Sequence, residues 1–495
     1  MMIYPRLEYA KDLSQNYNVI PISMEIYADM ETPIRIFKKY ENKKYCFLLE
    51  SVEGGEKLAR YSFIGRDPFL IFKSEGRKIS ICKKNEPPKE LMGNPIEVLR
   101  GIMENYRTPY MPHMPRFCGG AVGFFGYDLI RHYENLPDIP KDDLNLPECH
   151  FMFTDEVIVF DHLKQKIKIF VNMHVSGEVE ESYLIAQERL REIHREILCP
   201  TINIEEDLKK DKKNVKDTTK YTSNVSMQEY CDNVIKAKEY IKDGDIFQVV
   251  LSQRLCVSTK SDPLNVYRLL RLMNPSPYLY FLKFDDYILV GSSPEMLTRV
   301  EDDFIETRPM AGTRKRGQTL EGDKRLERDL LSNEKEIAEH TMLVDLGRND
   351  IGKVSEFGSI LLKDFMHVEK YSHVMHIVTN VIGRLRKDKT AFDALMSIMP
   401  AGTLSGAPKV RAMEIIDELE NIKRGPYGGA VGYLSFNGNL DTCITIRTII
   451  FKGDKAYVQS GAGIVYDSDP EKEYEECLNK AKVLLKALEE AGDVE

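Results

Sequence analysis

The chain has 495 residues and a formal net charge of -9, with 42% hydrophobic and 30% charged residues. This composition is typical of soluble globular proteins, and the length predicts two domains or one large composite domain. The acidic balance argues against a nucleic-acid partner, and no window approaches the ~18 unbroken apolar residues of a membrane-spanning helix. The start of the chain lacks the pattern of a secretory signal, and nine scattered cysteines without a C-x-x-C motif indicate reduced thiols in a cytoplasmic protein.

The part of the chain up to about residue 200 mixes short strands and loops. Apolar runs at 45–49 and 156–160 predict buried strands, and the glycine-dense segment 119–126 predicts a strand that packs closely against a neighbour. Apolar spacing over 182–198 predicts a helix. Residues 200–224 are polar and charged, so we expect a linker there that separates an N-terminal portion, 1–215, from a larger domain, 225–493.

The second part of the chain has a more regular pattern. Strands are predicted at 246–254, 279–284, 287–291, 296–300, 429–434, 442–451 and 456–459. Helices are predicted at 230–241, 263–273, 323–344, 372–385, 408–419 and 469–488. Successive strands between long helices indicate an α+β fold, with mainly antiparallel sheets packed face to face and helices on the outside.

Two pairs of glutamates are the first candidates for chemistry. Glu336 and Glu339, like Glu473 and Glu476, are three residues apart in predicted helices, so each pair can share one helical face. Carboxylates without a cluster of Cys or His are the ligands of a hard cation such as Mg²⁺. The alternative is that each pair simply faces solvent, which is common on helices.

Glycine-rich turns and one arginine supply candidate anion-binding groups. The Gly-Thr turn after 308–311 and the helix start at 402–409 both offer free backbone N–H groups, although a surface turn and a plain N-cap at Ser405 explain them equally. Arg447 is predicted inside an apolar strand and needs a partner, either a substrate carboxylate or a buried acid. His340, His373 and His376 are predicted on helices, where structural roles are common. The combination fits a small polycarboxylate substrate better than a nucleotide.

Several sequence blocks together resemble the chorismate-utilising enzymes, and within them the large subunits of anthranilate synthases. The resemblance covers essentially the whole chain. Its blocks are Pro-Met-Ala-Gly-Thr-Arg at 309–314, the segment 338–350, Gly-Thr-Leu-Ser-Gly-Ala-Pro-Lys at 402–409, Tyr-Gly-Gly-Ala-Val-Gly-Tyr at 427–433, Gly-Ala-Gly at 461–463 and Asn-Lys at 479–480.

The resemblance implies a role for each matching residue. Glu339 and Glu476 would hold Mg²⁺, with Glu473 beside them. Glu295 would be the general acid, and His376 and Thr403 would serve in the later elimination and in positioning. The residues implied to line the substrate site are Gly312, Thr313, Tyr427, Arg447, Gly461, Ala462, Gly463 and Lys480.

The implied reaction joins chorismate and ammonia to give anthranilate and pyruvate, the first step of tryptophan synthesis. Gln248 stands where isochorismate synthases carry a lysine that activates water, and Ala311 stands where aminodeoxychorismate synthases carry a lysine. Both positions favour ammonia as the nucleophile and anthranilate as the product. No Gly-x-Cys-x-Gly motif occurs, so we expect a separate glutamine amidotransferase subunit to deliver the ammonia.

The N-terminal portion resembles a feedback region for L-tryptophan. Ser51, Pro277, Tyr278 and Leu279 are the implied contacts, although a core strand and a proline-rich turn are the simpler interpretation of these segments. The absence of tryptophan from the chain fits an enzyme made when tryptophan is scarce. The remaining alternatives are an aminodeoxychorismate synthase, an inactive relative that binds only tryptophan or a partner, and a Mg²⁺-dependent module that binds another polyanion.

Overall fold

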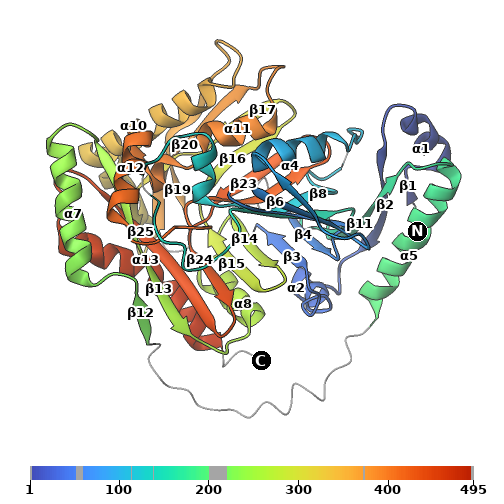
Figure 1. The fold of residues 1–495 in the computed structure, drawn as a ribbon, viewed down its shortest axis with the longest axis horizontal. Coiled ribbons are helices and arrows are strands. Elements are labelled where there is room, and N and C mark those ends of the chain that lie inside the picture. Colours follow the sequence, from blue (N-terminus) through green and yellow to red (C-terminus); the bar gives the residue numbers. More distant parts are fainter. Residues whose placement is uncertain are drawn as a thin grey trace.

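The computed structural model describes residues 3–51, 60–112, 114–137, 139–199, 220–371 and 374–491. Two large sheets form its framework, and the strands within each pair antiparallel throughout (Figure 1). Helices lie outside the sheets, which confirms the predicted α+β fold. Among the described residues, no helix combines the length and the apolar character that crossing a membrane requires.

The first sheet contains strands from the whole length of the chain. In spatial order its strands are β1 (Ile3–Tyr4), β2 (Val19–Tyr27), β11 (Lys166–His174), β10 (Glu156–Asp161), β4 (Tyr61–Arg66), β3 (Cys46–Glu50), β14 (Tyr278–Lys283), β15 (Tyr287–Ser293), β24 (Thr448–Lys452), β25 (Lys455–Ile464), β13 (Gln248–Ser258) and β12 (Tyr221–Ser223), with β21 (Gly406–Ala407) also paired to β13.

The second sheet is similar in size. Its strands are β18 (Met310–Lys315), β20 (Val374–Arg384), β17 (Phe304–Thr307), β16 (Met296–Glu301), β23 (Leu440–Ile444), β22 (Ala430–Ser435), β8 (Gly120–Phe125), β9 (Cys149–Thr154), β5 (Leu70–Glu75), β6 (Lys78–Lys83) and β7 (Lys89–Met92), with β19 (Leu361–Lys370) on the other side of β20.

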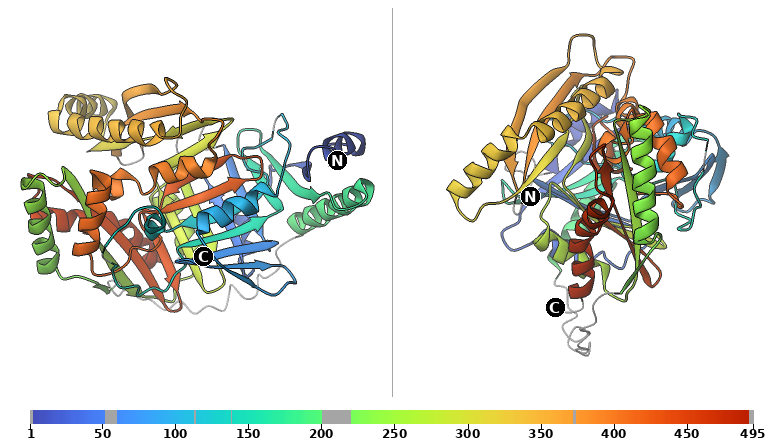
Figure 2. Two further views of the ribbon diagram at one scale, coloured as in Figure 1. Left: turned by 45° about the horizontal axis from the view of Figure 1, so that its top comes forward. Right: turned by 90° about the vertical axis from the view of Figure 1, so that its left-hand side faces the viewer.

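The helices cover the outer faces and both ends of the molecule. Figure 1 shows α1 and α5 at one end and α7, α12 and α13 at the other, and Figure 2 shows α9 and α10 on the outside. Their bounds are α1 Leu7–Ser14, α2 Pro33–Lys38, α4 Pro95–Glu104, α5 Val179–Leu198, α7 Met227–Lys242, α8 Pro263–Met273, α9 Leu320–Ser332, α10 Glu334–Gly352, α11 Ala391–Ile398, α12 Lys409–Leu419 and α13 Pro470–Glu490, with short 3₁₀ helices η1 at Tyr127–His132 and η2 at Gly402–Leu404.

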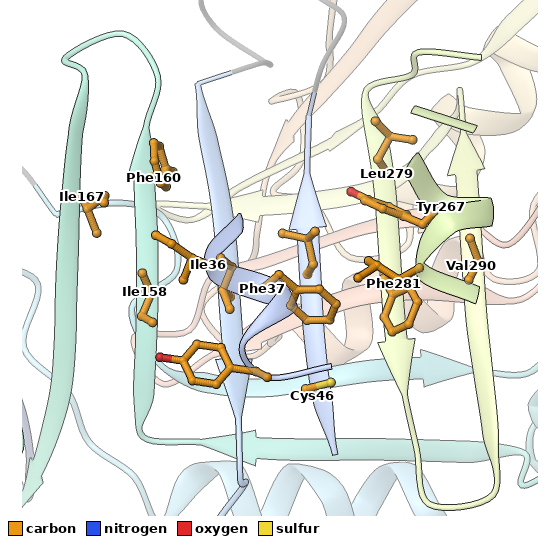
Figure 3. Close-up of a cluster of buried hydrophobic side chains, with 14 of the residues drawn as sticks. Ile36, Phe37, Cys46, Ile158, Phe160, Ile167, Tyr267, Leu279, Phe281 and Val290 are labelled. Carbon is orange, nitrogen blue, oxygen red and sulfur yellow. The ribbon is translucent and has the colours of Figure 1, made fainter. Parts of the chain in front are cut away.

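Aromatic side chains join the inner faces of the two sheets. Phe63 of β4 and Tyr433 of β22 face each other with ring centres 5.8 Å apart, inside a cluster drawn from both sheets. On the outer face of the first sheet, Phe37 of α2 packs edge-on against Phe281 of β14 at 5.2 Å, and Tyr267 of α8 lies on its other side (Figure 3). Each such buried side chain contributes roughly 1.5–3 kcal/mol.

Most predicted elements are confirmed, but the helix predicted at 372–385 is wrong. The described part of this segment is the strand β20, Val374–Arg384, which pairs with β17, β18 and β19. Its β-branched residues favour a pleated surface, and alternate side chains are buried. His376 therefore lies on a strand, and His373 lies outside the described residues.

One predicted helix and one predicted strand are each divided into two elements in the structure. The helix predicted at 323–344 is two helices, because Asn333 ends α9 and its side chain accepts a hydrogen bond from the backbone N–H of Glu336 to cap α10. The strand predicted at 442–451 is split into β23 and β24. Arg447 lies between them with φ +50, a left-handed conformation that a continuous strand does not allow.

Strands from before and after the predicted linker alternate in both sheets. Leu48 of β3 pairs with Phe281 of β14, and Gly123 of β8 pairs with Gly432 of β22. Within the predicted linker, residues 200–219 lie outside the described residues, and Tyr221–Ser223 forms the edge strand β12. The division into portions 1–215 and 225–493 stays a prediction.

Candidate active site

A cleft of about 1970 Å³ is bordered by the second part of the chain. Strands β13, β18, β20 and β25 and helices α10 and α13 contribute to its walls. It brings together nearly all the residues predicted for catalysis, metal binding and substrate binding, namely Glu295, Gly312, Thr313, Glu339, His376, Thr403, Tyr427, Arg447, Gly461, Gly463, Glu473, Glu476 and Lys480.

Ala462 is the predicted substrate residue that does not line this cleft. Successive side chains of β25 point to opposite faces, so Ala462 is buried in a core cluster with Val234 while its glycine neighbours face the cleft. A Cβ atom at Gly461 would lie 2.8 Å from the Tyr427 hydroxyl, and one at Gly463 would lie 2.5 Å from the side-chain nitrogen of Gln248. Because the two glycines lack side chains, the backbone of β25 can lie close to a ligand in the cleft.

Glu295 is a buried carboxyl at the base of the cleft. It directly precedes β16, is only 9% exposed, and accepts a hydrogen bond of 3.1 Å at Oε1 from the hydroxyl of Thr403 in η2. Burial raises the pKa of Glu295 to about 8. The side chain is therefore protonated at neutral pH and can donate a proton to a leaving group.

Three glutamates on two helices supply oxygen ligands. Glu339 of α10 and Glu473 and Glu476 of α13 border the same cleft, and burial with neighbouring carboxylates raises the pKa of Glu339 and of Glu473. In the described part of the chain, no three acidic, His or Cys side chains converge closely enough to hold a metal alone. Mg²⁺ characteristically takes one or two carboxylates together with substrate and water oxygens, so this donor set fits it.

Glu336 has a different environment from Glu339, its partner in the sequence pattern. Its Oε1 accepts a 2.8 Å hydrogen bond from Nη1 of Arg314, which also binds Asp329. This ion pair occupies the Glu336 carboxylate and ties α10 to β18.

Arg447 is a half-buried cation at the wall of the cleft. Its Nη1 donates a 2.7 Å hydrogen bond to the carbonyl oxygen of Lys480, and among the described residues no carboxylate forms an ion pair with it. The choice between a substrate carboxylate and an acidic side chain as its partner stays a prediction, and Glu476 is the carboxylate whose charge acts on Arg447. Burial lowers the pKa of Arg447, as expected for a desolvated cation. The remaining donors of the guanidinium are available to an anion in the cleft.

Gly312, Thr313 and His376 form a polar group on neighbouring strands. Nδ1 of His376 lies 3.0 Å from the Gly312 carbonyl oxygen and 3.0 Å from the Thr313 hydroxyl. A carbonyl only accepts, so Nδ1 carries the proton and Nε2 keeps a lone pair. Burial lowers the pKa of His376, which keeps the ring neutral and able to accept a proton.

The cleft also contains polar residues that the sequence reasoning did not assign to it. Gln459 lies two residues before Gly461 on the same face of β25, so the alternation of the strand could have identified it. Lys335 borders the cleft from the first turn of α10, and no pattern in the sequence distinguishes it from the surrounding charged residues.

A second cavity, of about 560 Å³, lies between the sheets and shares no lining residue with the cleft. The four residues predicted for feedback binding all line it, because β3 pairs with β14 and places Glu50, the residue before Ser51, opposite Leu279. The Tyr278 hydroxyl donates to Asp441 over 2.9 Å, and the Ser51 hydroxyl is buried without a hydrogen-bond partner among the described residues. A polar ligand would satisfy that hydroxyl.

Comparison with known proteins agrees with this geometry. The profile of the family described as chorismate binding enzyme matches residues 44–486. The chain is 64% identical to anthranilate synthase component 1 of Acetivibrio thermocellus, with 100% of both proteins covered, and 47% identical to that of Aquifex aeolicus, with 98% of both covered.

Solved structures show the same fold. The crystal structure of anthranilate synthase component I from Streptococcus pneumoniae superimposes with a TM-score of 0.78 at 38% identity, covering 93% of this chain and 99% of that one. The menaquinone-specific isochorismate synthase from Escherichia coli shares the fold alone, with a TM-score of 0.69 at 18% identity, covering 97% of this chain and 98% of that one. The chain belongs to the chorismate binding enzymes, and within them to the anthranilate synthase component 1 proteins.

Proposed function

We propose that this chain converts chorismate and ammonia into anthranilate and pyruvate, as the large component of a cytoplasmic anthranilate synthase. The observation that carries the proposal is the convergence of the protonated Glu295, the guanidinium of Arg447 and three glutamates in one cleft. These groups match the chemistry of a dicarboxylate that must lose a hydroxyl group.

Recognition of chorismate rests on its two carboxylates. Arg447 donates hydrogen bonds to one of them, and Lys480 adds a second positive charge at the same wall. Glu339, Glu473 and Glu476 would hold Mg²⁺, and the ion would supply positive charge that offsets the negative charge of the acids and the substrate. The backbone of Gly312 and Thr313 and the glycines of β25 fix the position of the ring.

The first chemical step replaces a hydroxyl group by an amine. Ammonia forms a C–N bond to the ring carbon next to the carboxylate-bearing carbon, and both ring double bonds shift by one position as the C–O bond to the hydroxyl breaks. Glu295 gives its proton to that oxygen, so the hydroxyl leaves as water, and the new ammonium group returns a proton. Thr403 holds the Glu295 carboxyl in place.

The second step eliminates pyruvate. Nε2 of His376 takes the proton from the ring carbon that carries the amine, and the C–O bond to the enolpyruvyl group breaks. The released enolpyruvate gains a proton to become pyruvate, and the ring becomes aromatic as anthranilate. The neutral tautomer of His376 favours this role.

The choice of ammonia over water rests on the side chains beside the cleft. Gln248 and Ala311 both line it, and neither can act as a base toward water. A separate glutamine amidotransferase subunit supplies the ammonia in a heterooligomer, which fits the name component 1 of the relatives. L-Tryptophan, the end product of the pathway, binds the cavity at Ser51, Pro277, Tyr278 and Leu279 as a feedback inhibitor.

Product analysis tests this proposal. The purified chain is incubated with chorismate, Mg²⁺ and ammonium at mildly alkaline pH, and the products are separated by chromatography. Anthranilate supports the proposal. An aminodeoxychorismate product would assign the chain to the folate-type branch, and the absence of any product even with an amidotransferase subunit present would favour an inactive relative.

A further inference from the structure

Arg424 is a buried arginine behind the wall of the cleft, in the loop between α12 and β22. It is 2% exposed, and its guanidinium binds both carboxylate oxygens of Glu420 with hydrogen bonds of 2.8 and 2.6 Å. It also donates to the backbone carbonyl oxygens of Leu404, over 2.6 Å, and Val250, over 2.7 Å. One side chain thus joins three segments of the chain.

Glu420 extends this network of hydrogen bonds to β13 and, through β13, to β25. Its Oε1 accepts hydrogen bonds of 2.8 and 2.9 Å from the backbone N–H and the hydroxyl of Ser252 in β13. The Ser252 hydroxyl in turn accepts a 2.9 Å hydrogen bond from the side-chain amide of Gln459 in β25. The ion pair therefore sets the orientation of the Gln459 amide.

Two tyrosine rings flank the guanidinium. The central carbon of the Arg424 guanidinium lies 4.6 Å from the ring centre of Tyr127 and 5.6 Å from that of Tyr427. A cation over an aromatic face is attracted to it, most strongly where water is excluded. The position of the Tyr427 ring, whose hydroxyl lies against Gly461, is coupled to the same arginine.

The groups held by this pair have one property in common. Val250, Leu404, Tyr427 and Gln459 come from four separate segments, and all of them line the cleft, whereas Arg424 and Glu420 do not. A buried ion pair adds little net stability compared with apolar side chains of similar volume. A forked guanidinium, however, fixes several acceptors at once, which apolar side chains cannot do.

We infer that Arg424 and Glu420 are positioning residues that hold the substrate-facing groups of the cleft in fixed positions relative to one another. The inference rests on the proposed function, because it assigns those groups to chorismate. Neither residue touches the substrate, and both act through the tyrosine, the amide and the two carbonyl groups described above.

A double variant, Arg424→Met with Glu420→Gln, tests this role. It removes both charges together, which avoids leaving one buried charge unpaired. The matched control is Arg60→Met with Asp161→Asn, which removes a two-bonded pair with hydrogen bonds of 3.2 and 2.9 Å in the first sheet, away from the cleft. Thermal unfolding, kcat and KM for chorismate are measured for both variants and for the unaltered chain.

The expected result is an unfolding temperature close to that of the unaltered chain and a KM for chorismate raised about 10-fold or more, with the control unchanged in KM. An unchanged KM in a folded double variant would overturn the inference. If the double variant does not fold, the KM of the single variant Arg424→Lys tests the inference instead. Lysine keeps the charge but cannot span Glu420 and both carbonyls, so a raised KM supports positioning and an unchanged KM refutes it.

Failure of the proposed function gives a different outcome. If the unaltered chain makes no anthranilate, that proposal falls, and chorismate binding is then measured by calorimetry on the same three proteins. Weaker binding by the double variant alone supports the positioning role, and equal binding by all three contradicts it.

Discussion

The hydroxyl of Thr403 donates a hydrogen bond to Oε1 of Glu295, 3.1 Å away, and this bond partly offsets the effect of burial on the acidity of the carboxyl. Burial raises the pKa of Glu295 to about 8, while the hydrogen bond from Thr403 and the charge of Lys480 lower it. The contact joins η2 to the residue before β16 and holds the carboxyl in the wall of the cleft.

The first prediction concerns the pH dependence of turnover. In this account Glu295 acts in its protonated form. The value of kcat/KM should therefore stay constant below about pH 8, and above pH 8 it should fall about tenfold per pH unit. Thr403→Val removes a bond that favours the ionised form, so the alkaline limb should move to higher pH. Thr403→Ser keeps the hydroxyl and should keep the limb in place. A limb that moved to lower pH in the valine variant would contradict this account.

The second prediction concerns the glutamates assigned to Mg²⁺. Glu476→Gln should reduce Mg²⁺-dependent turnover by roughly 100-fold or more, because it removes a charged ligand. Tryptophan binding and the unfolding temperature should be unaffected. Glu475→Gln is the matched control, since the exposed neighbouring residue of α13 does not line the cleft. Titration of activity with Mg²⁺ measures both variants, and normal Mg²⁺-dependent activity of Glu476→Gln would disprove the ligand assignment.

The third prediction concerns Arg447. Arg447→Met should raise the KM for chorismate by about 10- to 100-fold, the effect of losing hydrogen bonds to a charged group. It should not lower the free energy of unfolding, because the residue is a half-buried cation that forms no ion pair with a carboxylate among the described residues. Arg447→Lys should recover part of the binding. Strong destabilisation with an unchanged KM would instead mean that Arg447 is a structural residue.

The fourth prediction concerns the cavity between the sheets. Ser51→Ala removes a buried hydroxyl that has no hydrogen-bond partner among the described residues, so it should raise the tryptophan concentration needed for inhibition by about 10-fold and leave kcat unchanged. Ser74→Ala is the control, because Ser74 is also buried without a partner but does not line the cavity. Inhibition curves compare the two. Equal sensitivity of both variants to tryptophan would exclude Ser51 from the site.

Local patterns predict the fold class and the glutamate pairs, whereas most of the other cleft residues are assigned from the resemblance to the chorismate-utilising enzymes. The glutamate pairs on α10 and α13 and the glycines of β25 are visible as spacing, and thirteen of the fourteen residues assigned to catalysis, metal or substrate line one cleft. Ala462 is the exception, since the Gly-Ala-Gly motif identifies the strand but not the face on which each residue lies.

Features that depend on pairing between distant strands could not be predicted. The segment at 374–384 has enough apolar spacing to suggest a helix, and its pairing with three other strands decides against it. The left-handed conformation of Arg447 and its contact with Lys480 likewise arise from tertiary structure. The role of Arg424 cannot be predicted from the sequence, because its partners lie in separate segments: Val250 in β13, Leu404 in η2 and Glu420 just after α12.

The most direct test of the central claim is the simultaneous measurement of anthranilate and pyruvate from chorismate, ammonium and Mg²⁺. The chain has no tryptophan, so anthranilate fluorescence can be followed against a low protein background. The account predicts equal amounts of the two products, suppression by L-tryptophan, and loss of both products in Glu295→Gln. Pyruvate without anthranilate, or full activity of Glu295→Gln, would contradict it.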